Sequence, residues 1–287
     1  MRPMAIVLGL AAALTYGAAD FVGGMASRKA PLLSVVLLSQ VAGSALLLAA
    51  LPFFLDPGPT AAALGWGAGS GAAGATGVLF LYRGLAAGPM SVVAPITAVE
   101  AAGVPVLWGL ATGERPATVA LIGVVVALVA VVLVAGYEPP ASRAAERIPF
   151  LRAPGVADAL IAGVSFGAFF ILLSKAGDDA GLWPLVGARG ASLSLLGVLV
   201  VSRRHALTAA PGTRSAIVAA GLLDVAANLL YMLSTREGLL SIVAVLTSLY
   251  PATTVLLARV FLGERIGRLQ MAGLAAAVAG VVMMAAA

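Results

Sequence analysis

The chain has 287 residues, of which 61% are hydrophobic and only 10% are charged, and its mean hydropathy is +1.08. Soluble domains contain roughly 45–50% apolar and about 25% charged residues, so this composition excludes an ordinary globular protein as well as a disordered chain. A helix that crosses a bilayer needs about 20 apolar residues, and ten such helices would use about 200. The composition therefore indicates a polytopic membrane protein with short connections.

The net charge of +5 is explained by Lys and Arg side chains that anchor loops at lipid headgroups, so we predict no nucleic-acid partner. Because the chain has no cysteine and one histidine, its sequence offers no disulfide, Cys-based metal site or His cluster. The sequence also lacks a Walker A loop, a G-x-S-x-G elbow and an HExxH motif. We therefore expect no cofactor, no ATP-driven transport by this chain alone and no enzymatic activity.

Apolar runs separated by turn and charge signals predict an all-α membrane protein with ten transmembrane helices. In chain order these helices are expected over residues 4–26, 32–55, 61–82, 89–111, 117–136, 155–175, 182–201, 213–234, 239–261 and 267–286. The third contains Gly67 and Gly71 at GxxxG spacing, which predicts close packing against another helix, and Arg83-Gly84 is expected to end it. The longest polar stretch, residues 137–154, is interpreted as a linker.

The two sides of this linker repeat each other at an offset of 150 residues. Gly113-Glu114-Arg115 recurs as Gly263-Glu264-Arg265, and the same register aligns GPMSVVAPIT (88–97) with GLLSIVAVLT (238–247). We therefore predict two five-helix repeats, 1–136 and 155–287. Because five is odd, the second repeat would enter the membrane from the opposite side, which leaves both termini on one side. Inverted repeats are typical of secondary transporters, in which the substrate binds where the repeats meet.

The stretch LTSLYPATTVLLARVFLGERIGRLQMAGLAAAVAGVVMM (246–284) resembles the last two helices of the EamA-type transporters of the drug/metabolite transporter superfamily. Residues 96–134 form a looser copy, and ALTYGAADFVGG (13–24) is similar to the first helix of that family. The resemblance covers nearly the whole chain. It implies ten helices around a central cavity in the cell membrane and secondary transport, commonly efflux, of small metabolites or drugs. It specifies no substrate.

The two Gly-Glu-Arg turns are the most recognisable motif. We expect each to be a tight turn at the membrane interface, in which the glycine ends a helix and the glutamate pairs with the arginine. A direct chemical role for them is the less favoured interpretation.

Polar side chains inside the predicted helices are costly in a bilayer and usually face a cavity, so they are the candidate substrate- or ion-binding residues. Glu100 lies in the middle of the fourth helix between Pro95 and Pro105, with Thr97 one turn earlier. Proline removes a backbone donor, so we expect the helix to be locally opened beside this acid. Glu100 is therefore the first-choice proton carrier, with Asp224 or Asp20 next. The alternative is a structural carboxyl that hydrogen-bonds to a neighbouring helix.

Further candidates come from the other helices. Arg189 is the one basic residue clearly inside a predicted span, where it could bind an anionic group or pair with an acid. Tyr250 aligns with Glu100 at the 150-residue offset. The remaining candidates share helix faces, one pair on the first helix and one on the eighth: Tyr16 with Asp20, and Asp224 with Asn228.

The leading hypothesis is a secondary transporter that moves a small metabolite, amino acid or drug by alternating access, in the exporting direction and coupled to protons. The alternatives are a membrane-embedded enzyme or lipid-handling protein that uses the buried carboxylates, and a non-transporting assembly subunit. The repeat favours the transporter, because alternating access needs two matched halves. The sequence does not indicate an oligomeric state.

The orientation in the membrane is predicted from the basic residues outside the spans. Four share a side with the termini, and twelve lie on the other side: Arg28, Lys29, Arg83, Arg143, Arg147, Arg152, Arg203, Arg204, Arg214, Arg259, Arg265 and Arg268. The positive-inside rule then puts the termini outside, whereas the family resemblance implies cytoplasmic termini. We adopt the charge count because it is a property of this sequence. A reporter enzyme that is active only outside the cytoplasm should be active when it is fused to the C-terminus. Activity of a cytoplasm-specific reporter at the same position would contradict this orientation.

Overall fold

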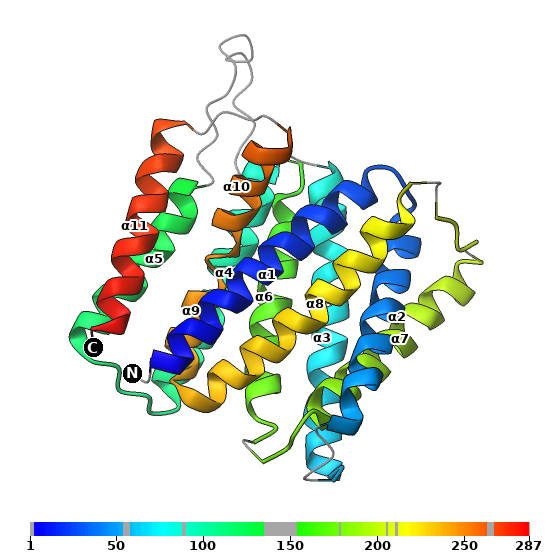
Figure 1. The fold of residues 1–287 in the computed structure, drawn as a ribbon, viewed down its shortest axis with the longest axis horizontal. Coiled ribbons are helices and arrows are strands. Elements are labelled where there is room, and N and C mark those ends of the chain that lie inside the picture. The colour runs from blue at the N-terminus through cyan, green and yellow to red at the C-terminus, as the bar shows by residue number, and fades with distance from the viewer. Residues whose placement is uncertain are drawn as a thin grey trace.

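The computed structural model describes residues 3–53, 58–87, 90–134, 154–177, 179–204, 206–209, 212–262 and 267–286. Over these residues the chain forms helices and no strand (Figure 1). The helices are α1 (Pro3–Ser27), α2 (Leu32–Ala50), the short 3₁₀ helix η1 (Leu51–Phe53), α3 (Ala61–Ala87), α4 (Met90–Ala111), α5 (Thr118–Val134), α6 (Val156–Ser174), α7 (Trp183–Ser202), α8 (Arg214–Glu237), α9 (Leu240–Thr247), α10 (Tyr250–Leu262) and α11 (Arg268–Ala285).

The helices on the two sides of the predicted linker match at the offset found in the sequence. α4 begins at Met90 and α9 at Leu240, and α5 begins at Thr118 and α11 at Arg268, each pair 150 residues apart. The packing repeats as well: α1 packs on α8, their counterparts α6 and α3 pack on each other, and α5 packs on its own counterpart α11. Both termini lie at the same edge of the molecule (Figure 1).

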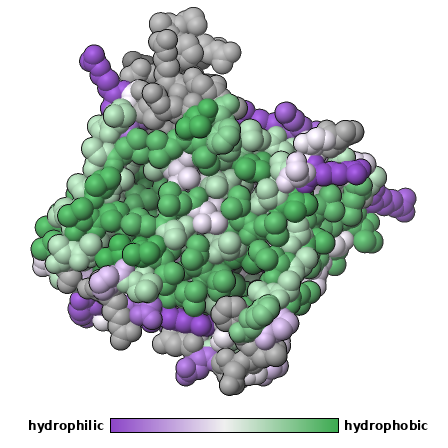
Figure 2. Space-filling model, in the orientation of Figure 1, coloured by the Kyte–Doolittle hydropathy of each residue, from purple (hydrophilic) through white to green (hydrophobic). Residues whose placement is uncertain are grey.

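Six helices are long and apolar enough to cross a membrane: α1, α2 extended by η1, α6, α7, α8 and α11. The chain has further shorter apolar segments in α4, in α5 and across α9 and α10. On the face shown in Figure 2, hydrophobic residues cover the middle and hydrophilic residues gather along two opposite edges. This distribution fits a molecule with an apolar belt in lipid. The number of ten spans stays a prediction.

Close packing at glycines joins α3 to α7, as the GxxxG spacing predicts. A Cβ atom at Gly67 would lie 2.1 Å from the carbonyl oxygen of Pro184, and one at Gly71 would lie 2.0 Å from that of Ala188. Either would be a severe overlap with backbone. Ser192 on α7 uses this proximity and donates a hydrogen bond of 2.8 Å to the Gly71 carbonyl. The packing interpretation of these glycines is therefore confirmed.

The equivalent fourth and ninth predicted helices differ, and the difference reverses our expectation. α4 is continuous through the positions of Pro95 and Pro105, so the local opening expected beside Glu100 is not observed. Its close packing along α6 stabilises it, since a Cβ at Gly167 would lie 2.5 Å from the Cβ of Val104. The break occurs instead between α9 and α10. There Pro251 has no N–H to donate to the carbonyl four residues earlier.

The end of α3 also differs from the prediction. The helix continues to Ala87, so Arg83-Gly84 does not end it. Arg83 is half exposed and forms an ion pair with Asp158 on α6. Gly84 is buried, and a Cβ there would lie 3.2 Å from the Cβ of Asp158. A charged residue and a glycine therefore mark a contact between helices here, not a turn.

The first Gly-Glu-Arg turn has a structural role that the sequence did not indicate. Gly113 ends α4 with a φ of 103°, as expected. The Glu114 side chain, however, does not pair with Arg115. Its Oε1 accepts a hydrogen bond from the backbone N–H of Leu240 (3.0 Å), and its Oε2 accepts one from Ser241 (3.2 Å). Glu114 thus caps α9, where helices expose unpaired N–H groups and attract negative charge.

The second Gly-Glu-Arg turn, residues 263–265, lies outside the described residues, as does the predicted linker except for Pro154. The repeat boundaries at residues 136 and 155 accordingly stay predictions.

Replacing Glu114 by Ala should destabilise the protein, because two backbone N–H groups of α9 lose their acceptor where Leu240 and Ser241 are buried. We expect a loss of about 1–2 kcal/mol, the range for an N-terminal cap, measured as a lower melting temperature of the purified protein in detergent. Arg115→Gln is the matched control, because Arg115 is exposed and, within the described part of the chain, donates only to the Glu114 main-chain carbonyl. Equal melting temperatures for Glu114→Ala and the control would contradict the capping role.

Candidate functional site

A cavity lies among helices of both halves. Its lining is contributed by α1, α2, α3 and α4 from the first half and by α6, α7, α8 and α10 from the second. The lining residues are Tyr16, Ala19, Asp20, Ser39, Gln40, Gly71, Gly74, Val78, Tyr82, Ala101, Phe166, Phe169, Phe170, Leu185, Ala188, Arg189, Ser192, Ala220, Asp224, Asn228 and Tyr250.

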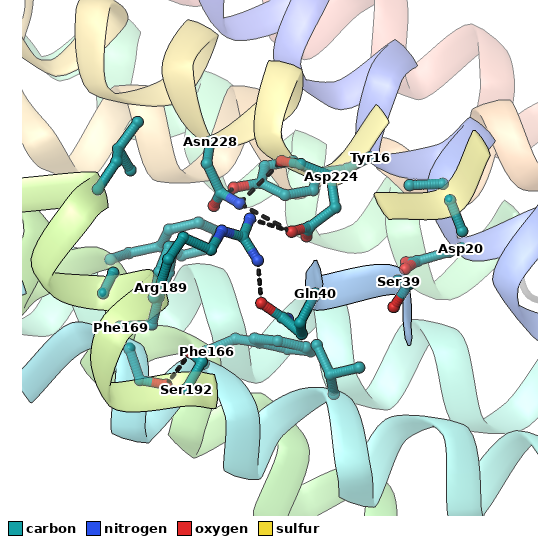
Figure 3. A pocket seen from close by; sticks show the side chains of 18 of the residues that line it. Tyr16, Asp20, Ser39, Gln40, Phe166, Phe169, Arg189, Ser192, Asp224 and Asn228 are labelled. Carbon is teal, nitrogen blue, oxygen red and sulfur yellow. Dashed lines mark hydrogen bonds and ion pairs between the residues drawn. The ribbon is translucent and has the colours of Figure 1, made fainter. Parts of the chain in front are cut away.

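A chain of hydrogen bonds runs across one side of this cavity (Figure 3). Arg189 donates to the side-chain oxygen of Gln40 and forms an ion pair with Asp224. Asn228 donates to the Asp224 main-chain carbonyl at 2.8 Å and to its carboxylate at 3.1 Å. Tyr16 in turn donates to the side-chain oxygen of Asn228 at 2.6 Å. These five residues, here called the Arg189 network, connect α2, α7, α8 and α1.

The ion pair in this network is largely withdrawn from solvent. The side chains of Arg189 and Asp224 are 10% and 26% exposed. Taking two charges out of water costs several kcal/mol per ion, which only mutual attraction and further hydrogen bonds offset. Gln40 and Asn228 supply these hydrogen bonds. The guanidinium is therefore neutralised within the protein itself.

The second carboxylate of the cavity has no such partner. Asp20 follows Tyr16 by one turn of α1 and lines the same cavity. Among the residues that the structure describes, none forms a hydrogen bond or ion pair with the Asp20 side chain. In Figure 3 it lies beside Ser39, apart from the dashed lines of the Arg189 network. The hydroxyl of Ser39 donates to the Val36 carbonyl, 2.9 Å away, and so is already engaged.

Another part of the cavity lining is aromatic and adjoins the Arg189 network, since Tyr16 and Phe170 pack edge to face with ring centres 6.2 Å apart. Phe166, Phe169 and Phe170 on α6, here called the aromatic wall, all line it. Phe169 and Phe170 pack edge to face with ring centres 5.4 Å apart. Gly74 makes room for this wall, since a Cβ there would lie 3.0 Å from a ring carbon of Phe169.

The repeat gives equivalent positions of the cavity different side chains. At the 150-residue offset, the aromatic wall on α6 is equivalent to Tyr16, Ala19 and Asp20 on α1. Equivalent positions of matched helices thus carry an acid in one half and a phenyl ring in the other. The scaffold is repeated, but the chemistry of the cavity is not.

Six of the eight candidate residues from the sequence line this one cavity: Tyr16, Asp20, Arg189, Asp224, Asn228 and Tyr250. Thr97 does not. Its hydroxyl donates to the carbonyls of Val93 (3.0 Å) and Ala159 (3.2 Å), which joins α4 to α6. Glu100 is partly buried and also lies outside the lining, on the face of α4 that packs against α6; a Cβ at Gly163 would lie 2.5 Å from the Glu100 Cβ.

Sequence reasoning missed several lining residues. Gln40 is a polar residue inside a predicted span and could have been found by the rule that identified Arg189. The aromatic wall could have been found by transferring Tyr16 and Asp20 to the second repeat. Tyr82 lies where the third helix was wrongly expected to end.

Two further observations limit the chemistry of the site. The hydroxyl of Tyr250 is buried and has no hydrogen-bond partner in the described part of the chain. In that same part, no group of three or more His, Cys, Asp or Glu side chains could hold a metal ion.

The Arg189–Asp224 pair should be strongly coupled. Asp224→Asn leaves a buried guanidinium without its counter-charge, so we expect a loss of about 3–5 kcal/mol of stability, the range for breaking a buried ion pair. Adding Arg189→Gln to Asp224→Asn should recover much of this loss, because no uncompensated charge remains. The measurement is a double-mutant cycle on the unfolding free energy in detergent. Additive effects of the two substitutions would contradict the coupling.

Comparison with known proteins agrees with this architecture. No curated protein matches the chain. Among solved structures, one described only as the crystal structure of a protein matches with a TM-score of 0.72 and 18% identity, over 99% of this chain and 96% of that one. This likeness shows a shared fold. The sequence model of the EamA-like transporter family matches residues 3–136 and again 153–286, which together are nearly the whole chain. The protein is therefore an integral membrane protein that belongs to the EamA-like transporter family.

Proposed function

We propose that this protein is a secondary transporter that carries a small molecule through the central cavity by alternating access. The observation that carries the proposal is the composition of the cavity, which takes lining residues from both halves and has two carboxylates and a guanidinium within apolar helices. Ionisable residues inside membrane helices are rare and mark substrate or ion pathways. As a member of a transporter family, the chain is expected to use this cavity for its substrate.

Three observations support an inverted repeat. The helix bounds agree at the 150-residue offset, and both termini lie at one edge of the molecule. Helix pairs that pack on each other also have counterparts in the repeat that pack on each other, as α1 with α8 and α6 with α3. An odd number of spans per repeat gives opposite orientations to the two halves. In such transporters one half rocks against the other around a fixed site. Export across the cell membrane is the direction that the resemblance to EamA-type transporters favours.

The energy for accumulation is proposed to come from protons that bind Asp20. A carboxylate without a partner, next to the substrate, is in position to exchange protons with either side as the cavity reorients. Asp224 is the weaker candidate, because protonating it would break the Arg189 network. Glu100 was the first choice from the sequence, but it faces α6 outside the cavity lining. We therefore propose a structural role for Glu100.

Reconstitution into liposomes with an imposed pH gradient tests this function. An internal pH-sensitive dye would report whether members of a panel of amino acids, amines and nucleosides dissipate the gradient. Asp20→Asn keeps the shape of the side chain but cannot release a proton, so it should abolish substrate-dependent proton flux. Glu100→Gln, the same change on α4, should retain it.

Empty liposomes give the background leak of the gradient. Proton flux that persists in Asp20→Asn and is lost in Glu100→Gln would return the carrier role to Glu100. Transport of a panel member that is insensitive to the gradient in every variant would contradict proton coupling while preserving the transporter. The failure of every panel member to cross the membrane would contradict the function itself.

A further inference from the structure

We propose that the cavity selects organic cations, specifically an amine with an aromatic or apolar body. The ammonium group would bind Asp20, and the body would lie against the aromatic wall. This inference rests on the proposed function, in that it takes the cavity as the substrate site. It goes beyond that function by assigning the charge and shape of the substrate.

The first argument is the charge balance of the cavity. Its lining contains two carboxylates, Asp20 and Asp224, and one basic residue, Arg189. Arg189 and Asp224 neutralise each other in the ion pair. Asp20 is therefore the carboxylate of the lining whose charge, when it is ionised, no lining base balances. A carboxylate in a poorly solvated site is stabilised by a nearby positive charge, and among the lining residues no other basic side chain supplies one.

The second argument concerns anions. A carboxylate or phosphate on a substrate would need a free cation, but Arg189 already donates to Gln40 and Asp224. An anion bound beside this pair would add negative charge where Asp224 already balances the guanidinium and Asp20 lines the same cavity. The same argument disfavours zwitterions such as amino acids, whose ammonium could bind Asp20 but whose carboxylate would have no partner.

The third argument is that the aromatic wall lines the same cavity as Asp20. Phe166 and Phe169 are drawn around the same cavity as Asp20 in Figure 3. Aromatic faces attract cations and also bury apolar groups, so the wall suits both parts of an amine. Tyr250 lines the cavity with a buried hydroxyl that has no partner among the described residues. An ammonium N–H would give this oxygen the hydrogen bond that it lacks.

A set of four probes that share a phenylethyl body separates charge from shape. Phenethylamine is a cation at neutral pH, phenylalanine is a zwitterion, phenylpropionate is an anion and phenethyl alcohol is neutral. We expect the purified full-length protein in detergent to bind radiolabelled phenethylamine. The other three compounds should compete at concentrations at least about tenfold higher, because a charged hydrogen bond is worth about 1.5–3 kcal/mol and 1.4 kcal/mol corresponds to tenfold in affinity.

Variants assign this selectivity to the named residues. Asp20→Asn should weaken phenethylamine binding by about 10- to 100-fold and leave competition by phenethyl alcohol unchanged, which also shows that the variant is folded. Asp20→Glu retains the charge and should retain binding. Asp179→Asn is the matched control, because Asp179 is an exposed carboxylate outside the cavity lining. Phe166→Leu should weaken the binding of phenethylamine more than the binding of phenethyl alcohol.

The outcomes separate this inference from the proposed function. Preferential binding of phenylpropionate, phenylalanine or phenethyl alcohol would overturn the inference, as would unchanged amine binding in Asp20→Asn. The absence of binding by all four probes, together with transport of some other panel member in liposomes, would overturn the cation selectivity and leave the transporter intact. Transport is judged only by the liposome experiment, so the two failures are distinguishable.

Discussion

The ion pair between Arg189 and Asp224 limits what the cavity could bind in the function that we propose. A guanidinium inside a membrane protein needs a counter-charge, which Asp224 provides. The side-chain oxygen of Gln40 accepts a second hydrogen bond from the same guanidinium. With Asp224 as its counter-charge, the guanidinium offers a ligand no unbalanced positive charge. The remaining polarity is set by Asp20. The selectivity that we propose thus follows from which charges the protein pairs internally.

A repeated scaffold supports this unrepeated chemistry. Glycines let the backbones approach at related places, as Gly71 does at Ala188 and its equivalent Gly221 does at Ser39, where a Cβ would lie 2.0 Å from the carbonyl oxygen in each case. Such contacts depend on small residues and tolerate little change, so both halves retain them. Asp20 and Phe170, which line the cavity, make no such glycine contact within the described residues. Asp20 and Phe170, equivalent in the repeat, accordingly differ in charge and polarity.

The fold was predictable because its signals are long and repeated. Hydrophobic runs and the 150-residue offset located the helices to within a few residues. The rule that polar groups inside membrane helices face a cavity identified six of the residues that line it. The errors arose where one residue type has two physical uses. Pro251 lies at the break between α9 and α10, whereas α4 stays continuous through its two prolines. The sequence does not show that α4 packs along α6, which is what stabilises it. Glu100 illustrates the same limit, because the sequence gives its depth but not the direction in which it points.

The difference between α4 and the α9–α10 pair bears on the alternating access that we propose. In an inverted repeat, alternating access would have each half adopt in turn the conformation that the other has just left. Here the continuous α4 and the broken α9–α10 segment occupy equivalent positions, and Glu114 caps the start of α9 from the other half. The break is tied to Pro251, and its equivalent position holds Ala101. The two halves therefore differ at this point in sequence as well as in helix continuity. In the alternating access that we propose, any exchange between the halves would therefore be approximate, and movement of the α9–α10 segment would have to release or carry with it the Glu114 cap.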